Sequence, residues 1–191
     1  KEATFFYSMQ EAVETIHNET YSILIETFIR DTNEKRRGYN AISCGYYPSI
    51  KKIADWMFEW MDADVPLTER VVAFACVEGI LFSSSFAAIY WIKRRNILHG
   101  LCKANEFIAR DEALHTEFAV ALYHELTSTS RVHTSLGGVG QSLNTRFSKI
   151  NEYPILLESK IHSIIKSSVT TSECFIREAL KVDLIGMNAD D

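Results

Sequence analysis

Two pairs of glutamate and histidine lie inside the apolar faces of two helices that the sequence predicts. Glu14 and His17 belong to the stretch EAVETIHNETY, and Glu112 and His115 belong to ARDEALHTEF. Three residues of α-helix turn through about 300°, so the two side chains of each pair lie roughly 60° apart and can reach a common point. A buried carboxylate is destabilising unless it is paired or bound to a metal ion. The chain must therefore fold so that these acids find partners inside it.

One Glu-x-x-His pair arises often by chance, whereas two pairs on separate long helices indicate a shared metal site. Glu78 adds a third acid, in a helix where apolar neighbours would solvate a free carboxylate poorly. Its alternative partner is a buried cation such as Arg70 or Arg110. Two Glu-x-x-His pairs with single acids from other helices form the ligand pattern of ferritin-like di-metal bundles. Oxygen and imidazole ligands without thiolate suit iron or manganese.

The spacing of apolar residues predicts an all-α bundle of long helices, and the ligand pattern makes a ferritin-like bundle the expected fold. Proline is absent before Pro48 and glycine before Gly38, which leaves room for a long first helix. The weak helix formers Gly79 and Ser83 to Ser85 favour a kink in the fourth helix. The predicted helices cover residues 2–30, 32–42, 48–61, 66–96, 100–126 and 154–180. Apolar stripes alone would fit a structural or interaction module equally well. The acids within these stripes are what indicates chemistry.

Composition limits the size and the class of the protein. With 191 residues, 47% of them hydrophobic, the chain can bury a substantial core, and we predict a single helical domain over residues 1–191. A net charge of -5 leaves only the short run Lys93 to Arg95 as a basic cluster, so we expect no nucleic-acid partner. We also expect no membrane association. Residues 127–149, rich in Ser, Thr and Gly, are predicted to be a mobile surface insertion.

The cysteines indicate the compartment. Cys44, Cys76, Cys102 and Cys174 show no CxxC spacing, so neither a zinc knuckle nor a disulfide framework is predicted. A reducing, cytoplasmic location is the simpler interpretation. The first residue is Lys1 rather than Met, and we expect the chain to be a piece of a longer protein.

Four stretches of the chain, taken in order, closely resemble the radical-generating small subunit of class I ribonucleotide reductase. The resemblance covers nearly the whole chain outside residues 127–149. It implies a centre of two iron ions, with manganese as an alternative, that reacts with dioxygen and oxidises a nearby tyrosine to a stable radical. A separate large subunit uses that radical to reduce ribonucleotides. The four stretches are EAVETIHNETYSILI, ERVVAFACVEGILFSSSFAAIYWIKRR, NEFIARDEALHTEF and EALKVDLIGMN.

The resemblance also implies roles for the five candidate ligands. By similarity to the family, Glu14 and Glu112 bridge the two ions, and His17 and His115 each bind one of them. Glu78 is expected to be a carboxylate ligand of the second ion.

Tyr21, Asp111 and three apolar residues complete the predicted site. Tyr21 follows His17 by four residues and therefore shares its face, which an ordinary half-buried tyrosine would also do; the resemblance implies that it carries the radical. Asp111 lies about 100° round the helix from Glu112 and can accept a hydrogen bond from a metal-bound histidine, with a surface salt bridge as the alternative. The resemblance implies that Asp111 bonds His17 and joins the radical path. It also implies an apolar pocket round the radical, formed by Phe82, Phe86 and Ile108.

The expected partners are a large subunit, a second small subunit in a homodimer or heterodimer, and dioxygen. The family's first ion takes a further aspartate from an earlier helix, and its C-terminal tail docks on the large subunit; neither lies within residues 1–191. We therefore expect residues 1–191 by themselves to be inactive. Two alternatives remain open, a stand-alone ferritin-like di-metal oxidase or peroxidase and a metal-free paralogue that serves as a structural partner.

Overall fold

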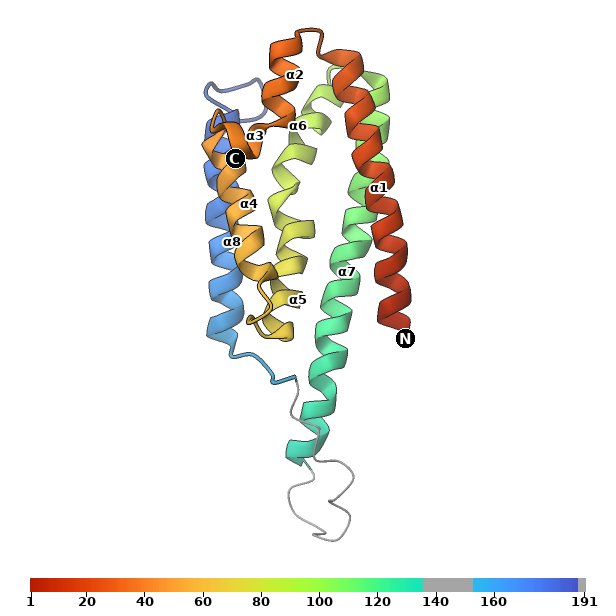
Figure 1. Cartoon of the computed structure of the whole chain (residues 1–191), viewed down its shortest axis with the longest axis vertical. Coiled ribbons are helices and arrows are strands. Elements are labelled where there is room, and N and C mark those ends of the chain that lie inside the picture. The colour runs from red at the N-terminus through yellow and green to blue at the C-terminus, as the bar shows by residue number, and fades with distance from the viewer. Residues whose placement is uncertain (136–152, 189–191) are drawn as a thin grey trace.

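Long helices lying side by side along one axis make up the computed structural model (Figure 1), which describes residues 1–135 and 153–188. Within these ranges the regular elements are helices, together with one isolated bridge between Leu184 and Met187. The all-α prediction is therefore confirmed. The elements are α1 (Glu2–Phe28), α2 (Thr32–Tyr39), α3 (Ala41–Cys44), α4 (Pro48–Met61), α5 (Leu67–Cys76), η1 (Val77–Leu81), α6 (Ser83–Lys93), α7 (His99–Ser135) and α8 (Glu158–Ala179).

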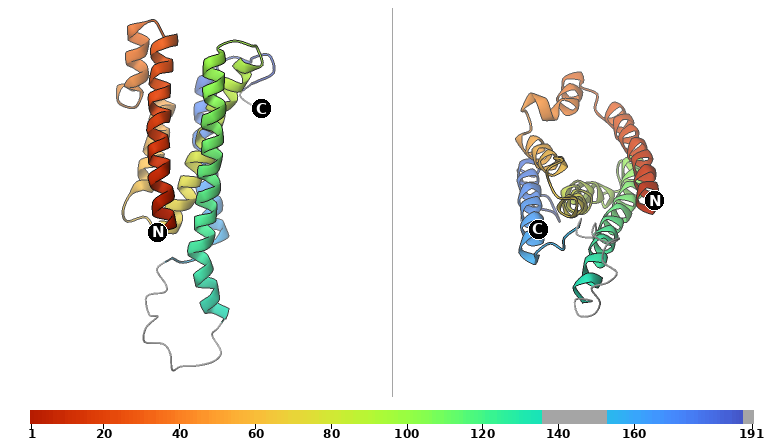
Figure 2. Two further views of the ribbon diagram at one scale, coloured as in Figure 1. Left: turned by 90° about the vertical axis from the view of Figure 1, so that its right-hand side faces the viewer. Right: turned by 60° about the horizontal axis from the view of Figure 1, so that its bottom comes forward.

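Packing orders the helices across the bundle. α1 packs on α7, α7 on α5 and α6, α5 on α8, and α8 on α4. α1 and α7 run in opposite directions, as the two views of Figure 2 show. The buried apolar cluster forms where α4, α5, η1 and α8 meet, so the core lies on one side of α7 and α1 lies on the other. Its members are Trp56, Ala73, Cys76, Val77, Leu81 and Ile164.

Two predicted helix boundaries differ from the structure where specific hydrogen bonds form. The helix predicted over residues 32–42 is two helices, because the amide of the Asn40 side chain donates to the Arg36 carbonyl and closes α2 at that point. The last helix begins at Glu158 rather than at Pro154. The backbone N–H of Leu156 instead donates to the Tyr123 hydroxyl, 3.2 Å away.

α7 continues nine residues past its predicted end at residue 126. The Ser and Thr content of that stretch suggested a loop, and this prediction was wrong for residues 127–135. Thr127 Oγ1 donates to the Tyr123 carbonyl at 2.9 Å, and Ser128 Oγ donates to the Glu125 carbonyl at 2.8 Å. Hydroxyls that bond carbonyls one turn back are satisfied inside a helix. Residues 136–149 of the predicted insertion lie outside the described part of the chain.

The kink predicted in the fourth helix is a π-helical turn. η1 lies between α5 and α6 and interrupts the regular α-helix there. It contains Glu78 and Gly79. A Cβ placed on Gly79 would lie 3.1 Å from Thr116 Cγ2 and 3.2 Å from Thr116 Oγ1. The missing side chain therefore lets η1 approach α7, and the adjacent Glu78 comes close to the ligands of that helix.

The segment Leu67–Lys93, which combines α5, η1 and α6, is long and apolar enough to cross a membrane, and it contains an 18-residue window with a mean hydropathy of 1.8. A core helix of a globular protein passes the same test. This segment packs against α4, α7 and α8, and 28% of that window is buried inside the described bundle. The absence of membrane association stays a prediction.

Gly79→Ala tests the close approach of η1 to α7. Thr116 would have to move while its Oγ1 donates to the Glu112 carbonyl, so we expect the free energy of unfolding to fall by about 1–3 kcal/mol. In a Thr116→Ala background the clash is gone, and the gain in helix propensity, about 1 kcal/mol, should make the same change stabilising. Urea unfolding of the four proteins measures both effects. Equal effects of Gly79→Ala in both backgrounds would contradict the packing explanation.

Candidate metal centre

Four of the five predicted ligands converge where α1, η1 and α7 meet. Glu14, Glu78, Glu112 and His115 each offer one ligand atom, and these atoms all lie within 4.8 Å of one another. Glu78, Glu112 and His115 are buried, whereas the side chain of Glu14 is 43% exposed. Three helices that are far apart in the sequence thus place three carboxylates and an imidazole in one small volume.

His17 joins this cluster at its edge and completes the predicted set. Its Nδ1 lies 3.2 Å from Glu112 Oε1 and 3.4 Å from Glu14 Oε2. His115 Nδ1 lies 2.8 Å from Glu112 Oε2 and 3.2 Å from Glu14 Oε1. Glu14 and Glu112 therefore each direct one oxygen toward each histidine, which is the arrangement that a bridging carboxylate requires.

The second ring nitrogen of His17 faces an acid outside the cluster. His17 Nε2 and Asp111 Oδ2 are 3.1 Å apart. A histidine that binds a metal through Nδ1 keeps its proton on Nε2 and donates it to such an acceptor, which fixes the tautomer and the ring orientation. The Asp111 side chain is 34% exposed, so this contact links the buried cluster to the protein surface.

Glu78 contacts neither of the cations considered as alternative partners. Gln10 Nε2 donates to Glu78 Oε1 at 3.2 Å, and Glu78 Oε2 lies 3.8 Å from His115 Nδ1. Burial, and then the contact with Glu112, raises the pKa of Glu78 to about 9. Burial is also the main cause that raises the pKa of Glu14, followed by the charge of Glu112. These carboxylates lack a positive charge strong enough to compensate for their desolvation.

The donor set fits a metal site. Among the described residues, Glu14 Oε1 and His17 Nδ1 are buried atoms that have no hydrogen-bond partner. Both point into the cluster, as their distances to the opposite ligands show. Carboxylates and imidazoles without a thiolate suit iron, manganese or another divalent cation of similar preference. A cation bound among them would neutralise the acids and satisfy the unpaired atoms.

Tyr21 is half-buried on the same helix as Glu14 and His17. Burial raises the pKa of Tyr21 to about 12, and the charges of Glu112 and Glu14 contribute. The phenol is therefore neutral and lies within the electrostatic reach of the cluster.

The three residues predicted to form the radical pocket differ in exposure. Ile108 is 4% exposed, Phe86 is half-buried and Phe82 is 37% exposed. Phe82 is therefore only partly covered by the described residues. A shared role of these side chains round Tyr21 stays a prediction.

Gln10 was not among the predicted site residues. Gln10 is 5% exposed, and its carboxamide contacts a candidate ligand on another helix. Its position could have indicated a role in the site, because it lies four residues before Glu14 on a helix face that the sequence already assigns to metal binding. A glutamine rarely ranks as a functional candidate because it neither titrates nor commonly binds metals.

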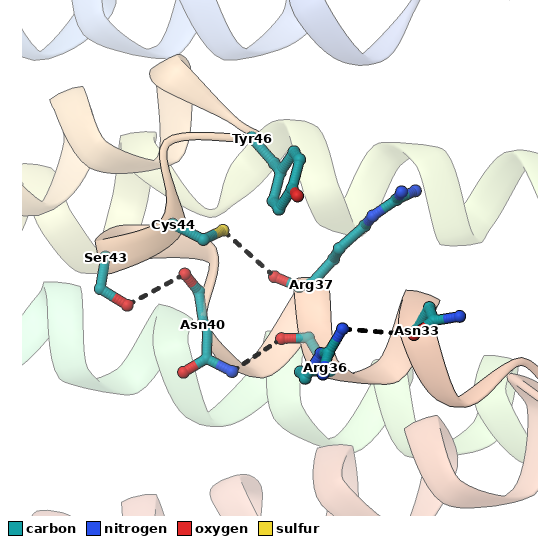
Figure 3. Close-up of a pocket in the computed structure, with 7 residues that line it drawn as sticks. All are labelled: Asn33, Arg36, Arg37, Asn40, Ser43, Cys44 and Tyr46. Atoms are coloured by element: carbon teal, nitrogen blue, oxygen red, sulfur yellow. Dashed lines mark hydrogen bonds between the residues drawn. The ribbon is translucent and has the colours of Figure 1, made fainter.

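Two of the hollows in the described structure contain none of the candidate ligands in their lining. One of about 360 Å³ lies beside α2 and α3 (Figure 3), where Arg37 pairs with Glu34 and stacks over the Tyr46 ring. The other is an apolar groove of about 480 Å³ between α1, α4 and α5. It is lined by Tyr7, Met57, Trp60, Met61, Leu67, Arg70, Val71, Ala73, Phe74, Val77 and Leu122. Neither groups acids and histidines as the cluster does.

Glu78→Gln tests how the buried, ionisable side chain of Glu78 affects the stability of the fold when no metal ion is bound. The folded state retains a proton on Glu78 that the unfolded chain releases above its ordinary pKa of 4.5. This contribution to stability is fully present below pH 4.5 and is lost as pH rises toward 9. The Gln variant, which cannot ionise, should be at least as stable as the wild type at pH 8 and should show a smaller pH dependence. Urea unfolding in chelator between pH 5 and 9 measures this, with the exposed Glu11→Gln as the control. A marked loss of stability at pH 8 would show instead that Glu78 belongs to a structural ion pair.

Comparison with known proteins agrees with this geometry. The family model described as ribonucleotide reductase, small chain matches residues 1–191. The chain is 42% identical over 188 residues to the ribonucleoside-diphosphate reductase small subunit of Dictyostelium discoideum, a match that covers 47% of the relative and 98% of this chain. It is 43% identical over 188 residues to the ribonucleoside-diphosphate reductase small chain of Plasmodium falciparum, with 46% of the relative and 98% of this chain covered.

A solved structure shows the same fold. The homodimer of ribonucleotide reductase Rnr4 from Saccharomyces cerevisiae superposes with a TM-score of 0.71 at 24% identity, covering 50% of that protein and 97% of this one. The ferritin-like architecture predicted from the sequence is thereby confirmed. The chain spans about half the length of the curated relatives it matches. It belongs to the ribonucleotide reductase small chain family.

Proposed function

We propose that the protein containing this chain is the radical-generating small subunit of a ribonucleoside-diphosphate reductase, an oxidoreductase. The observation that carries the proposal is the convergence of two Glu-x-x-His pairs and Glu78 beside Tyr21, in a chain of this family. Two iron ions bound there would supply dioxygen activation and the oxidising equivalent for a tyrosine. The product of this subunit is then a radical, which a large subunit uses to reduce ribonucleotides to deoxyribonucleotides.

The five candidate ligands are proposed to have different roles in binding two ions. Glu14 and Glu112, which each reach toward both histidines, are suited to bridge them. His17 and His115 supply one imidazole each, and Glu78 lies on the His115 side. Manganese would accept the same donors, and the proposal of iron rests on the resemblance to the family.

Tyr21 is the proposed radical site. Oxidation of a phenol to its radical removes one electron and one proton. Burial keeps the pKa of Tyr21 at about 12, so the proton stays on the phenol until the electron leaves. Carboxylates near the ring are the available proton acceptors.

Asp111 is proposed to link the centre to the large subunit. It contacts His17 on the inside and is partly exposed on the outside. A hydrogen-bonded path from the cluster to the surface would serve transfer of an electron and a proton between subunits. A stand-alone oxidase would not need this link. A metal-free paralogue would not need to retain all five ligands, so neither alternative accounts for the site as well.

We propose a second small subunit as a further partner, bound to the outer face of α1 and α7. Ile16 and Leu114 each follow a ligand glutamate by two residues, so each lies on the opposite side of its helix from the cluster. In the left view of Figure 2 these two helices lie side by side at the front. Large apolar side chains are exposed there: on α1 Phe5 (71%), Met9 (53%), Ile16 (62%) and Ile23 (58%), and on α7 Phe107 (48%) and Leu114 (55%).

Spacing and charge support a second copy of the protein as the occupant. Met9, Ile16 and Ile23 are seven residues apart, as are Phe107 and Leu114, and a repeat of seven favours helix-to-helix packing. Glu19 lies along the α1 stripe, whereas Arg110 lies along the α7 stripe. A two-fold contact that places α1 on the partner's α7 would bring these opposite charges together.

The full protein is proposed to be cytoplasmic. The four cysteines of residues 1–191 are free thiols in the structure, two of them buried. Unpaired cysteines are typical of a reducing compartment.

Tyr21→Phe in the full-length protein should retain about two metal ions per chain but lose the tyrosyl radical signal and the reductase activity. The hydroxyl is needed for the radical and lies outside the ligand set. Metal analysis, electron paramagnetic resonance and turnover with the large subunit measure the three properties. Tyr90→Phe, on an exposed tyrosine of α6, is the control and should behave as the wild type. A full radical signal in Tyr21→Phe would assign the radical to another residue.

Ile16→Lys should convert the full-length small subunit from dimer to monomer, because it places a charge in the centre of the apolar stripe. Thr15→Lys, exposed on the same helix but outside the stripe, should leave the dimer intact. Glu19→Arg and Arg110→Glu should each weaken the dimer and together restore part of the affinity. Analytical ultracentrifugation gives the dissociation constants. Equal dimer affinity in wild type and Ile16→Lys would show that the dimer contact does not use this face.

A further inference from the structure

Gln10 brings a carboxamide group to the ligand cluster from α1. It is 5% exposed, and it lies four residues before Glu14 on the same side of the helix. Its Nε2 donates to Glu78 Oε1 across the gap between α1 and η1, at 3.2 Å. The contact joins residues 68 positions apart in the sequence, so it depends on the fold and not on local helix geometry.

The two oxygens of Glu78 face different groups. Oε1 accepts from Gln10, whereas Oε2 is the oxygen recorded near His115, at 3.8 Å from Nδ1. A carboxylate beside a metal ion can bind through one oxygen or through both. A hydrogen bond that engages one oxygen leaves the other as the available ligand.

The location of Glu78 increases the need for such a restraint. Glu78 lies in the π-helical turn η1, where the regular spacing of helix hydrogen bonds is interrupted. Gln10 projects from the regular helix α1. A contact between the two elements therefore fixes the orientation of a side chain whose own backbone is irregular.

The neutrality of Gln10 also suits this role. A lysine or arginine at this distance would form a buried ion pair with Glu78 and compete with the metal ion for the carboxylate. An amide donates a hydrogen bond without bringing a competing charge. Gln10 Oε1 is buried and has no hydrogen-bond partner among the described residues, so the amide satisfies Glu78 while its own carbonyl stays unsatisfied.

We propose that Gln10 is a positioning residue for metal binding: it holds Glu78 Oε1 so that Glu78 Oε2 alone is presented to the ion beside His115. This inference rests on the proposed metal centre. It predicts that loss of the amide lowers the affinity for the ion on the His115 side more than the affinity for the ion on the His17 side, because Gln10 acts through Glu78.

The test is metal titration of the full-length, metal-free protein with Mn²⁺ alone. Gln10→Met keeps the length and the apolar stem of the side chain but removes the donor. We expect affinity to fall by roughly 10–100-fold for one of the two ions, the range found when groups that orient ligands are removed. The infrared carboxylate bands of the loaded protein should change as Glu78 becomes free to bind through both oxygens. The exposed Glu11→Met, one residue along, is the matched control and should change neither property.

A second background separates positioning from packing. In Glu78→Ala protein, Gln10→Met should cause no further loss of affinity, because the group through which it acts is absent. Gln10→Asn keeps an amide but is one methylene too short to reach Glu78, so it should reproduce the loss of metal affinity. It replaces Gln10→Met in the test if that variant fails to fold. The inference about Gln10 would be overturned if metal affinity and the infrared carboxylate bands were unchanged in these variants, or if Gln10→Met caused an equal loss of affinity in the Glu78→Ala background. Either result would leave the proposed function standing. Wild-type protein that binds no metal would overturn the proposed function and the inference with it.

Discussion

The crowding of three carboxylates inside an apolar bundle is the constraint on which the rest of this structure depends. Glu78 and Glu112 are buried, and Glu14 lies against both histidines. Burial, and then the contact with Glu112, raises the pKa of Glu78 to about 9, which favours its protonated form near neutral pH. Burial of acids in this way lowers the stability of the empty site and favours binding of a cation. At the proposed metal centre, the energy that the bundle loses by burying Glu78 would become part of the driving force for metal binding.

This constraint also explains how α1 is held. α1 contacts the rest of the described bundle mainly through α7, away from the large apolar cluster round Trp56. The junction combines the contact between His17 and Asp111 with the stacking of Phe6 on Phe118, whose ring centroids are 3.6 Å apart. Much of the polar part of the junction belongs to the metal cluster. Binding of a metal ion at the proposed centre would therefore order α1 against α7 and stabilise the fold at the same time.

The sequence predicted the parts of this site that follow from helix periodicity. Glu-x-x-His pairs have a fixed angular relation, so their convergence could be anticipated, and α1 and α4 end within two residues of their predicted limits. The extent of α7 could not be anticipated, because Thr127 and Ser128 satisfy their hydroxyls within the helix rather than breaking it. The π-helical turn and the contact between Gln10 and Glu78 depend on how closely η1 approaches its neighbours. That distance is set by tertiary packing at Gly79 and leaves little trace in a local pattern.

The two Glu-x-x-His pairs are related by an approximate local two-fold symmetry, because they lie on antiparallel helices. The distance from His17 Nδ1 to Glu112 Oε1 and that from His115 Nδ1 to Glu14 Oε1 are both 3.2 Å. Taken alone, the two pairs would make equivalent metal positions. Glu78 and Gln10 break the equivalence on the His115 side, whereas Asp111 breaks it on the His17 side. One position thus gains an additional carboxylate, while the other gains a hydrogen-bonded link to the surface. In the proposed metal centre, this asymmetry would let two similar ions differ in ligand charge and in their connection to the proposed partner subunit.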